Sequence, residues 1–301
     1  YNPNDRRSMV ARNIRNRVVT DVFEPGSSIK PFIVAAAMES TTLQPHDRID
    51  VSPGFVVLSD KKIKDSRNYK ELDVAGVLAK SSNVGIVKIA QEINDDVLAE
   101  KLRDYGLFSS SGIELPGEAS GLILSQHEWG GTYKSFLSFG YGAALSALQL
   151  ANAYLVIANE GVRRDVSVLQ DTQPLRGERV MDAGVALGIT EMLRGVVSAD
   201  GTGSKADAAA FTVAGKTGTA KKLKGGVYQD DSYLAVFTGL SPAKNPEIVV
   251  AVVIDDPKQN GFYGGQVAAP VFSRVVSRVL TYLDIKPNTD KIAASMVVGK
   301  G

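Results

Sequence analysis

Hydrophobic positions recur at helical spacing in several stretches of the chain. Residues 27–38, SSIKPFIVAAAM, open with a serine and continue as a strongly apolar run, so a buried helix is expected there. Residues 72–80 and 84–105 show helical spacing on either side of a polar triplet, Ser81-Ser82-Asn83. Further helices are predicted over residues 143–160, 182–197 and 266–283. A polar triplet between two buried helices is a favourable place for functional side chains.

The last third of the chain has a different pattern. Short β-rich runs at 211–220, 232–240 and 247–255 are separated by turn residues and predict three neighbouring antiparallel strands. The helix predicted over 266–283 would pack on one face of this sheet. Pro, Asp and Lys interrupt residues 41–70, which predicts loops and a small hairpin. The pattern therefore indicates an α/β (α+β) fold, with an antiparallel sheet flanked by helices and an all-helical subdomain.

Composition and charge exclude several function classes. The 34 basic and 33 acidic residues nearly cancel, so the chain has no overall nucleic-acid footprint. It has no cysteine, and its two histidines, His46 and His127, lie far apart without metal-ligand spacing. We therefore expect no metal, no cofactor and no nucleic-acid partner. The chain starts without Met and its longest apolar run is about a third of a membrane span, so we expect a soluble fragment of a longer polypeptide, in which any anchor or export signal would lie upstream.

A serine can be activated without histidine when a lysine one helical turn away presents its amine to the hydroxyl. The pattern Ser-x-x-Lys occurs three times, at Ser27/Lys30, Ser59/Lys62 and Ser241/Lys244. Only Ser27 opens a predicted buried helix, where free backbone N–H groups can also stabilise a reacting carbonyl oxygen. Ser59 lies in a charged stretch, and Ser241 is followed by a proline. The sequence therefore predicts Ser27 as the nucleophile.

Two further motifs follow Ser27 in the chain. Ser-x-Asn occurs at 66–68 and at 81–83, and the second copy is preferred because it joins two apolar helices. A buried hydroxyl there can relay a proton, and an asparagine can bind a peptide amide. Lys216-Thr217-Gly218 is the sole Lys-Thr-Gly of the chain and lies on a predicted strand. Taken alone, Lys216 fits a surface lysine at a strand edge, but a second lysine near Lys30 would lower the pKa of Lys30 and make its amine a better base.

Ser-x-x-Lys, Ser-x-Asn and Lys-Thr-Gly together are typical of penicillin-binding proteins and class A β-lactamases. The chain closely resembles the class B penicillin-binding transpeptidases, in particular the cell-division (septal) type called penicillin-binding protein 3. The matching segments are YNPN at 1–4, EPGSSIKPF at 24–32, KSSNVG at 80–85, LPGE at 115–118, SFGYG at 138–142, QLANAY at 149–154, KTGTAKK at 216–222, YGG at 263–265 and APVF at 269–272. The resemblance implies the fold shared by these transpeptidases and serine β-lactamases. We expect a catalytic domain over 24–285, a leading segment over 1–23 and a C-terminal tail over 286–301.

The resemblance also implies catalytic roles in a peptidoglycan D-Ala-D-Ala transpeptidase. Ser27 would attack the penultimate D-Ala carbonyl of a stem peptide, with Lys30 as its general base. Ser81 would carry the proton to the leaving amine. Asn83 would bind the substrate amide and orient Lys30, and Lys216 would tune the electrostatics. The acyl group would then pass to an amine of a neighbouring strand.

Substrate binding is assigned by the same resemblance. Thr217 and Thr219 would hold the terminal carboxylate, with Gly218 between them in the same stretch. The backbone N–H groups of Thr219 and of the nucleophile would form the oxyanion hole. Phe262 and Tyr263 match an aromatic pair that lies beside the substrate cleft in relatives, although packing in the interior is an equal alternative.

Three other functions share these motifs. A class A β-lactamase needs a carboxylate base in Glu-x-x-Leu-Asn, and no Glu between Asn83 and Lys216 begins that pattern. A D-Ala-D-Ala carboxypeptidase would differ by using water as the acceptor, and a β-lactam sensor domain would be acylated without turnover. The resemblance implies that β-lactam antibiotics acylate the nucleophile. It also implies divisome partners, including a glycosyltransferase, and a place at the periplasmic face of the bacterial cytoplasmic membrane.

Overall fold

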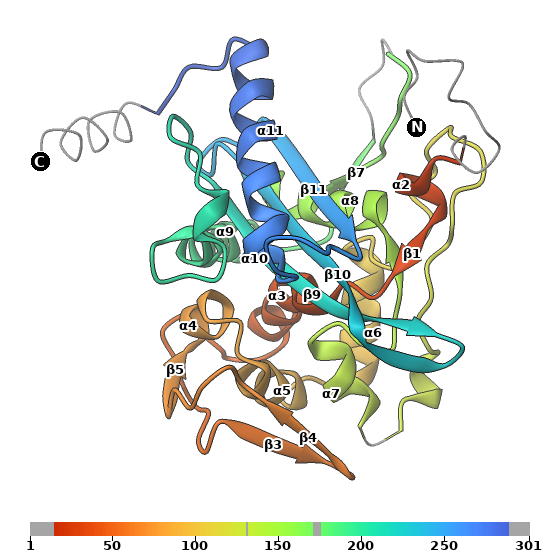
Figure 1. The fold of residues 1–301 in the computed structure, drawn as a ribbon, viewed down its shortest axis with the longest axis vertical. Coiled ribbons are helices and arrows are strands. Elements are labelled where there is room, and N and C mark those ends of the chain that lie inside the picture. Colours follow the sequence, from red (N-terminus) through yellow and green to blue (C-terminus); the bar gives the residue numbers. More distant parts are fainter. Residues whose placement is uncertain (1–14, 131, 171–175, 289–301) are drawn as a thin grey trace, which may run out of the picture.

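The computed structural model describes residues 15–130, 132–170 and 176–288. Its main sheet contains three described strands in the order β11-β10-β9, all antiparallel: β9 (Ala214–Lys224), β10 (Val227–Ser241) and β11 (Ile248–Asp255). Figure 1 shows α11 (Ala269–Tyr282) lying across one face of this sheet, preceded by α10 (Gly264–Val267). Helices α8 (Ala147–Ala158) and α9 (Ala183–Val197) contact the sheet from its other face.

Successive side chains of β10 point to opposite faces of the sheet, and the apolar core is correspondingly divided into two clusters. Val236 belongs to the large cluster, which includes residues of α8, α9 and a further helix, α3 (Lys30–Ser40). Its neighbour Phe237 belongs to the smaller cluster under α11. The ring centroids of Phe237 and Phe272 are 4.7 Å apart. The predicted three-stranded sheet and the helix that covers it are confirmed. Strands β9 and β10 are longer than predicted, and Lys221 and Lys222 lie within β9.

The helical part of the molecule lies behind the sheet and below it in Figure 1. It contains α3 (Lys30–Ser40), α4 (Val74–Ala79), α5 (Asn83–Gln91), α6 (Asp95–Asp104) and α7 (Tyr133–Ser138). The single helix predicted over 84–105 is wrong, because α5 ends at Gln91 and Asn94 caps the start of α6. Its side chain accepts hydrogen bonds from the N–H groups of Asp96 and Val97 at the start of α6.

Short strands pair away from the main sheet. They are β1 (Val22–Phe23) with β6 (Leu145–Ser146), β2 (Arg48–Asp50) with β5 (Glu71–Asp73), β3 (Phe55–Leu58) with β4 (Lys61–Lys64), and β7 (Val162–Arg164) with β8 (Gly177–Arg179). The β3–β4 pair confirms the small hairpin predicted within residues 41–70. The remaining elements are α2 (Arg17–Thr20) and the 3₁₀ helices η2 (Gly26–Ile29), η3 (Gln126–Glu128) and η4 (Ser204–Ala206).

The two ends of the described chain pack against the domain. In the predicted leading segment, 1–14 lie outside the described residues, while α2 and β1 are ordered and β1 pairs with β6. In the predicted tail, Asn288 Oδ1 accepts a hydrogen bond from the N–H of Thr212 at 2.8 Å, and 289–301 lie outside the described residues. The proposed boundaries at 24 and 285 therefore stay predictions. No described helix is both long and apolar enough to cross a bilayer.

Candidate active site

The segment that carries Ser27 is a 3₁₀ turn, η2, that runs directly into α3. The predicted helix is confirmed, but Ser27 itself precedes its α-helical part. Pro31 explains the tighter turn, because it has no N–H to donate to the carbonyl of Ser27. The N–H of Lys30 donates to that carbonyl instead, which closes a 3₁₀ turn. The Ser27 hydroxyl has no hydrogen-bond partner among the described residues and faces a cavity.

Backbone packs directly on backbone beneath the nucleophile. The N–H of Gly26 donates to the carbonyl of Gly140 over 3.2 Å. Gly140 has φ +87°, and a Cβ there would lie 2.1 Å from the carbonyl oxygen of Gly26, so only glycine fits. On the other side, a Cβ on Gly26 would lie 3.1 Å from the carbonyl oxygen of Thr219. The nucleophile turn is therefore held between the SFGYG segment and β9.

Lys30 is fully buried at the start of α3. Its Nζ donates to the carbonyl of Ser81 at 2.7 Å and to Asn83 Oδ1 at 2.8 Å, and it lies 3.2 Å from the carbonyl of Ser82 and 3.3 Å from Ser81 Oγ. These oxygens favour the ammonium form. Burial, followed by the charge of Lys216, opposes it and lowers the pKa of Lys30 well below its ordinary value. The charge of Asp65 raises the pKa of Lys30 by a smaller amount, so the lowering prevails.

The predicted contact between Lys30 and the nucleophile is not formed in this state. Among the described residues, no hydrogen bond joins Lys30 Nζ to Ser27 Oγ, although the two residues are one turn apart. Catalytic hydrogen bonds are commonly long without substrate and shorten in the complex. The amine is therefore positioned by Ser81 and Asn83, while the nucleophile remains open to the cavity.

The segment between α4 and α5 is held in one conformation. Ser81 has φ +57°, in the left-handed region that few non-glycine residues adopt. The Ser82 hydroxyl caps α5 by accepting from the N–H of Gly85 at 2.8 Å. The carboxylate of Asp65 accepts from Ser82 Oγ at 2.5 Å and from the first two N–H groups of α5 at 2.5 and 3.1 Å. These bonds fix the oxygens that surround Lys30.

Lys216 approaches the site from β9 and is also fully buried. Its Nζ donates to Ser81 Oγ at 2.9 Å, the same hydroxyl that lies 3.3 Å from Lys30 Nζ. Burial lowers the pKa of Lys216 to about 7. Two amines that meet at one hydroxyl cannot both be charged without a large cost, so the pair titrates as a coupled unit. The burial of Lys216 excludes the alternative that it is a surface lysine at a strand edge.

One cavity of about 460 Å³ collects most of the predicted site residues. Its lining includes Ser27, Ser81, Asn83, Thr217, Gly218, Thr219 and Tyr263. Lys30 and Lys216 lie behind this lining and reach it through Ser81. The structure therefore brings together residues that are separated by up to about 240 positions in the sequence. Their catalytic and binding roles stay predictions.

The Lys-Thr-Gly-Thr stretch forms one wall of this cavity. Thr217 Oγ1 lies 2.9 Å from Thr202 Oγ1, and Thr219 Oγ1 accepts from the N–H of Gly264 at 3.0 Å. A Cβ on Gly218 would lie 2.7 Å from the carbonyl oxygen of Pro25, so this position allows the strand to approach η2 closely. In the described sheet, β9 pairs with β10 on one side only. Its other edge faces the nucleophile turn, where alternate N–H groups are available to a substrate.

The aromatic pair occupies two different environments. Tyr263 lines the cavity and is 55% exposed. Phe262 stacks on Tyr233, with ring centroids 4.1 Å apart and planes at 18°, and its centroid is 4.4 Å from that of Tyr263. The cleft location predicted for the pair thus fits Tyr263, whereas Phe262 is half-buried in the aromatic stack beside it. Their role in binding substrate stays a prediction.

Several residues at the cavity were not identified from the sequence. They include Ser66, Lys80, Thr202, Ser204, Lys205 and Gln266. Asp65, which holds the start of α5, was not identified either. Ser66 belongs to the other Ser-x-Asn copy, at 66–68; it is exposed and bonded to Tyr69, yet it reaches the rim. The run Gly201-Thr202-Gly203 offered a signal, because small residues permit close backbone approach. A Cβ on Gly265 would lie only 2.2 Å from the carbonyl oxygen of Thr202.

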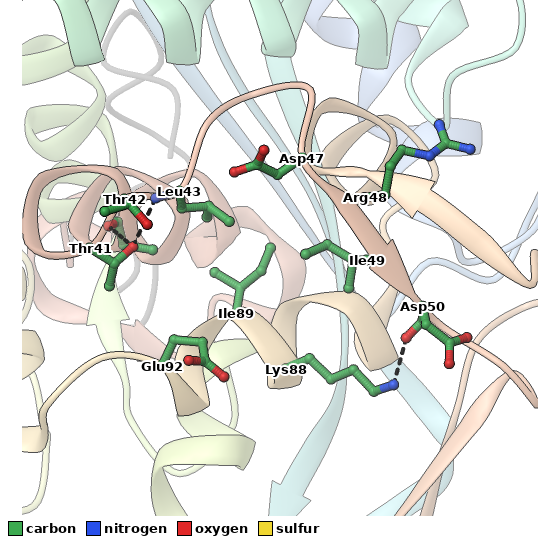
Figure 2. Close-up of a pocket in the computed structure, with 11 residues that line it drawn as sticks. Thr41, Thr42, Leu43, Asp47, Arg48, Ile49, Asp50, Lys88, Ile89 and Glu92 are labelled. Carbon is green, nitrogen blue, oxygen red and sulfur yellow. Dashed lines mark hydrogen bonds between the residues drawn. The ribbon is translucent and has the colours of Figure 1, made fainter.

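Another cavity of about 460 Å³ lies at the opposite ends of α3 and α5 (Figure 2). It has an apolar floor that includes Ile49 and Ile89, and Lys88 Nζ donates there to the carbonyl of Asp50 at 2.5 Å. None of the predicted site residues lines it. We therefore place the candidate active site at Ser27 and not at this cavity.

The chain matches known proteins along most of its length. The model of the penicillin binding protein transpeptidase domain matches residues 1–277. The probable peptidoglycan D,D-transpeptidase PenA of Neisseria flavescens is 39% identical over 287 residues, covering 95% of this chain and 71% of that protein. The peptidoglycan D,D-transpeptidase FtsI of Escherichia coli K12 is 36% identical over 288 residues, covering 96% of this chain and 49% of that protein. The chain thus spans about half the length of FtsI.

A solved structure agrees with these matches. The apo TP domain of penicillin-binding protein 3 from Burkholderia pseudomallei superposes with a TM-score of 0.87 at 39% identity, covering 91% of this chain and 84% of that chain. The resemblance to penicillin-binding protein 3 that was predicted from the sequence motifs is confirmed, as is the fold class. This chain belongs to the penicillin-binding protein transpeptidase family, whose similar members carry the names of peptidoglycan D,D-transpeptidases.

Proposed function

We propose that this chain is the catalytic domain of a peptidoglycan D,D-transpeptidase, which cross-links stem peptides through an acyl-enzyme on Ser27. One observation carries the proposal: two buried lysine amines meet at Ser81 Oγ beside an unpartnered serine hydroxyl. A lowered lysine pKa provides a neutral amine that can act as a base near neutral pH. Membership of the transpeptidase family supports the same reaction.

In the proposed acylation, each of these groups has one role. Ser27 Oγ attacks the carbonyl of the penultimate D-Ala, and its proton passes to the neutral amine of Lys30. Backbone N–H groups of Ser27 and Thr219 stabilise the oxyanion. The C–N bond to the terminal D-Ala then breaks, and the leaving amine takes its proton through the Ser81 hydroxyl. Thr217 and Thr219 hold the terminal carboxylate of the donor.

The fate of the acyl-enzyme depends on what can activate water. Neither of the two cavities that Ser27 lines has an Asp or Glu among its described lining residues. A hydrolytic enzyme of the class A β-lactamase type needs such a carboxylate. Its absence from the described lining supports a slowly hydrolysed acyl-enzyme that is resolved by an amine.

Mass spectrometry tests the proposal directly. The protein is incubated with excess benzylpenicillin over several hours, and its intact mass is followed before peptide mapping. We expect a persistent one-to-one adduct on Ser27 and no adduct in Ser27→Ala. The control variant Ser241→Ala changes the serine of another Ser-x-x-Lys copy and should keep the adduct. Rapid return to the unmodified mass would favour a β-lactamase, and an adduct on another residue would refute the site.

A D-Ala-D-Ala carboxypeptidase is the second candidate, because the same cavity could admit water as the acceptor. A D-alanyl thioester donor distinguishes the two reactions when it is supplied with and without D-alanine. Transfer product that increases with D-alanine supports the transpeptidase. Hydrolysis product alone, at every concentration of D-alanine, would favour the carboxypeptidase.

We also propose that the full-length protein acts in septal wall synthesis at the periplasmic face of the cytoplasmic membrane. It would work beside a cell-division glycosyltransferase and other divisome membrane proteins. The names of its relatives, including FtsI, support this placement. A fluorescent fusion of the full-length protein in its own host should concentrate at mid-cell in dividing cells. A uniform signal around the envelope would contradict the septal role.

A further inference from the structure

A half-buried carboxylate, that of Asp65, lies between the end of β4 and the start of α5. Its oxygens accept three hydrogen bonds, and all three donors belong to the segment 82–84. Oδ2 accepts from Ser82 Oγ at 2.5 Å, and Oδ1 accepts from the N–H groups of Asn83 and Val84 at 2.5 and 3.1 Å. Among the described residues, no lysine or arginine forms a salt bridge with this carboxylate. Its negative charge therefore acts mainly on the segment 82–84 and on the groups that this segment contacts.

The residues that bond to Asp65 also hold the amine of Lys30. Lys30 Nζ donates to Asn83 Oδ1 at 2.8 Å and lies 3.2 Å from the carbonyl oxygen of Ser82. The nitrogen of the Asn83 amide donates to the carbonyl of Lys64 at 3.3 Å, so the oxygen of that amide is directed at Lys30. Hydrogen bonds joined in a chain polarise one another. The carboxylate and the amine are thus connected through Ser82 and Asn83, although they do not touch.

The charges around Lys30 are otherwise positive. Burial and the charge of Lys216 lower the pKa of Lys30, whereas the charge of Asp65 raises it. Glu24, which precedes η2, is bonded to the SFGYG segment and to β10. Every charged residue in the described lining of the two cavities at Ser27 is a lysine: Lys61, Lys62, Lys64, Lys80, Lys205 and Lys221. A further positive charge at Lys30 is costly in such surroundings, and Asp65 is placed to reduce that cost.

We infer that Asp65 is a positioning residue that supplies the counter-charge for the ammonium formed at Lys30 during acylation; this rests on the transpeptidase function proposed above. As Ser27 Oγ bonds to the carbonyl carbon, its proton passes to Lys30 Nζ and the carbonyl oxygen becomes the oxyanion. Lys30 then carries a positive charge until it gives up this proton toward the leaving amine. The carboxylate of Asp65 stabilises that charge through the segment 82–83, without contact with the substrate.

Three variants separate the charge of Asp65 from its hydrogen bonds. Asp65→Asn removes the charge but keeps Oδ1, the oxygen that accepts from both N–H groups at the start of α5. Asp65→Glu keeps the charge on a longer side chain. Asp65→Ala removes the charge and the bonds together. The rate of acylation by a chromogenic cephalosporin is measured for each variant between about pH 5 and pH 9, a range that spans the acidic limb and the plateau.

The pH profile distinguishes a counter-charge from a purely structural role. Without the carboxylate the pKa of Lys30 is lower, so its amine stays neutral at lower pH and the acidic limb of Asp65→Asn moves to lower pH. The same amine is a weaker base, so the plateau rate should fall about tenfold. Asp65→Glu should keep the acidic limb near its wild-type position. Asp65→Ala should lose about 100-fold at the plateau, because the oxygens around Lys30 are no longer fixed.

A matched control is Asp182→Asn. The side chain of Asp182 also caps a helix, because it accepts from the N–H of Val185 at the start of α9 at 3.1 Å. The N–H of Asp182 donates to Glu39, at the opposite end of α3 from Lys30. This variant should leave the plateau and the acidic limb unchanged. Thermal unfolding checks that each variant is folded. If Asp65→Asn does not fold, Asp65→Glu still tests the charge, since a displaced limb in a variant that keeps the carboxylate contradicts the inference.

The possible failures have different meanings. A lower plateau with an unmoved limb in Asp65→Asn would leave Asp65 a structural role alone, and a limb that moves to higher pH would also overturn the counter-charge. In both cases acylation of Ser27 stands. A wild-type protein that is not acylated at Ser27 overturns the proposed function and this inference together.

Discussion

The two buried lysines belong to different parts of the molecule and are held in different ways. Lys30, on the helical side, has four oxygens around its Nζ, and all of them come from 81–83. Lys216, on the sheet side, reaches across to Ser81 Oγ, and its other hydrogen-bond partners among the described residues are the two oxygens of Thr217, at 3.3 and 3.4 Å. The helical side therefore fixes the position of its amine by itself, whereas the sheet side depends on contact with the helical side.

This difference suggests a division of labour between two residues of the same type. A general base must be placed accurately relative to the nucleophile, and the cage of oxygens around Lys30 meets that need. A residue that acts through its charge tolerates more freedom, which suits Lys216. The Ser81 hydroxyl joins the two parts, because it contacts both amines. Each of the following experiments alters one side of this comparison.

Replacing the base should have the largest effect. In Lys30→Met, we expect the rate of acylation by a chromogenic cephalosporin to fall about 1,000-fold, because no neutral amine remains to accept the proton of Ser27. Lys88→Met is a matched control on α5, at the far cavity, and should react at the wild-type rate. A loss of less than about tenfold in Lys30→Met would show that another group is the base.

Removing the charge on the sheet side should have a smaller effect with a distinct pH signature. In Lys216→Gln, we expect acylation at pH 7 to fall about 100-fold. The charge of Lys216 helps to lower the pKa of Lys30, so its loss raises that pKa and moves the acidic limb of the rate profile to higher pH. Lys216→Arg keeps a cation and should move the limb less. An unmoved limb in Lys216→Gln would mean that the two lysines do not interact.

Removing the hydroxyl between the lysines tests the contact itself. Ser81→Ala should slow acylation about tenfold, since a water can partly replace the relay of the proton to the leaving nitrogen. Ser66→Ala, at the rim of the same cavity, serves as the control for a lost serine hydroxyl. Rate constants from stopped-flow measurements would check both variants. Equal effects in the two would argue against a special role for Ser81.

The smallest effect concerns stability and its pH dependence. The pKa of Lys216 is about 7 in the folded state and 10.5 ordinarily, so the unfolded chain binds more protons between these values. The loss of folding free energy caused by burying Lys216 has its full size below pH 7 and disappears as the pH rises to 10.5. Lys216→Met removes it and should gain about 1–2 kcal/mol in the free energy of unfolding at pH 7.5. Urea titrations at pH 7.5 and 9.5 should show a smaller gain at the higher pH.

The local pattern of hydrophobic and polar residues predicted much of the fold and the choice between repeated motifs. The apolar run after Ser27 predicted a buried helix, and the β-rich context of Lys216 predicted a strand. Both elements are buried in the structure, and both lie beside the active-site cavity. The pattern failed where a single polar side chain decides the outcome. Asn94 divides the predicted helix over 84–105, because a side-chain cap competes with continuation of the helix.

Residues that act through distant contacts could not be located in this way. Asp65 lies in a charged stretch, and its role appears only when its carboxylate meets the start of α5. Thr202 reaches the cavity because a loop after α9 folds beside Thr217. Such positions depend on the tertiary fold and leave no periodic trace in the sequence.

The contact between Gly140 and Gly26 has a consequence for the evolution of drug resistance. Gly140 leaves no room for a side chain, and a Cβ on Gly26, at φ +54°, would crowd the carbonyl oxygen of Thr219, so selection cannot easily alter the surface beneath the nucleophile. Resistance substitutions should accumulate at exposed rim positions such as Lys205 and Gln266. An inhibitor that binds mainly to the main chain around Ser27, with few contacts to the rim, should therefore lose affinity through few single substitutions.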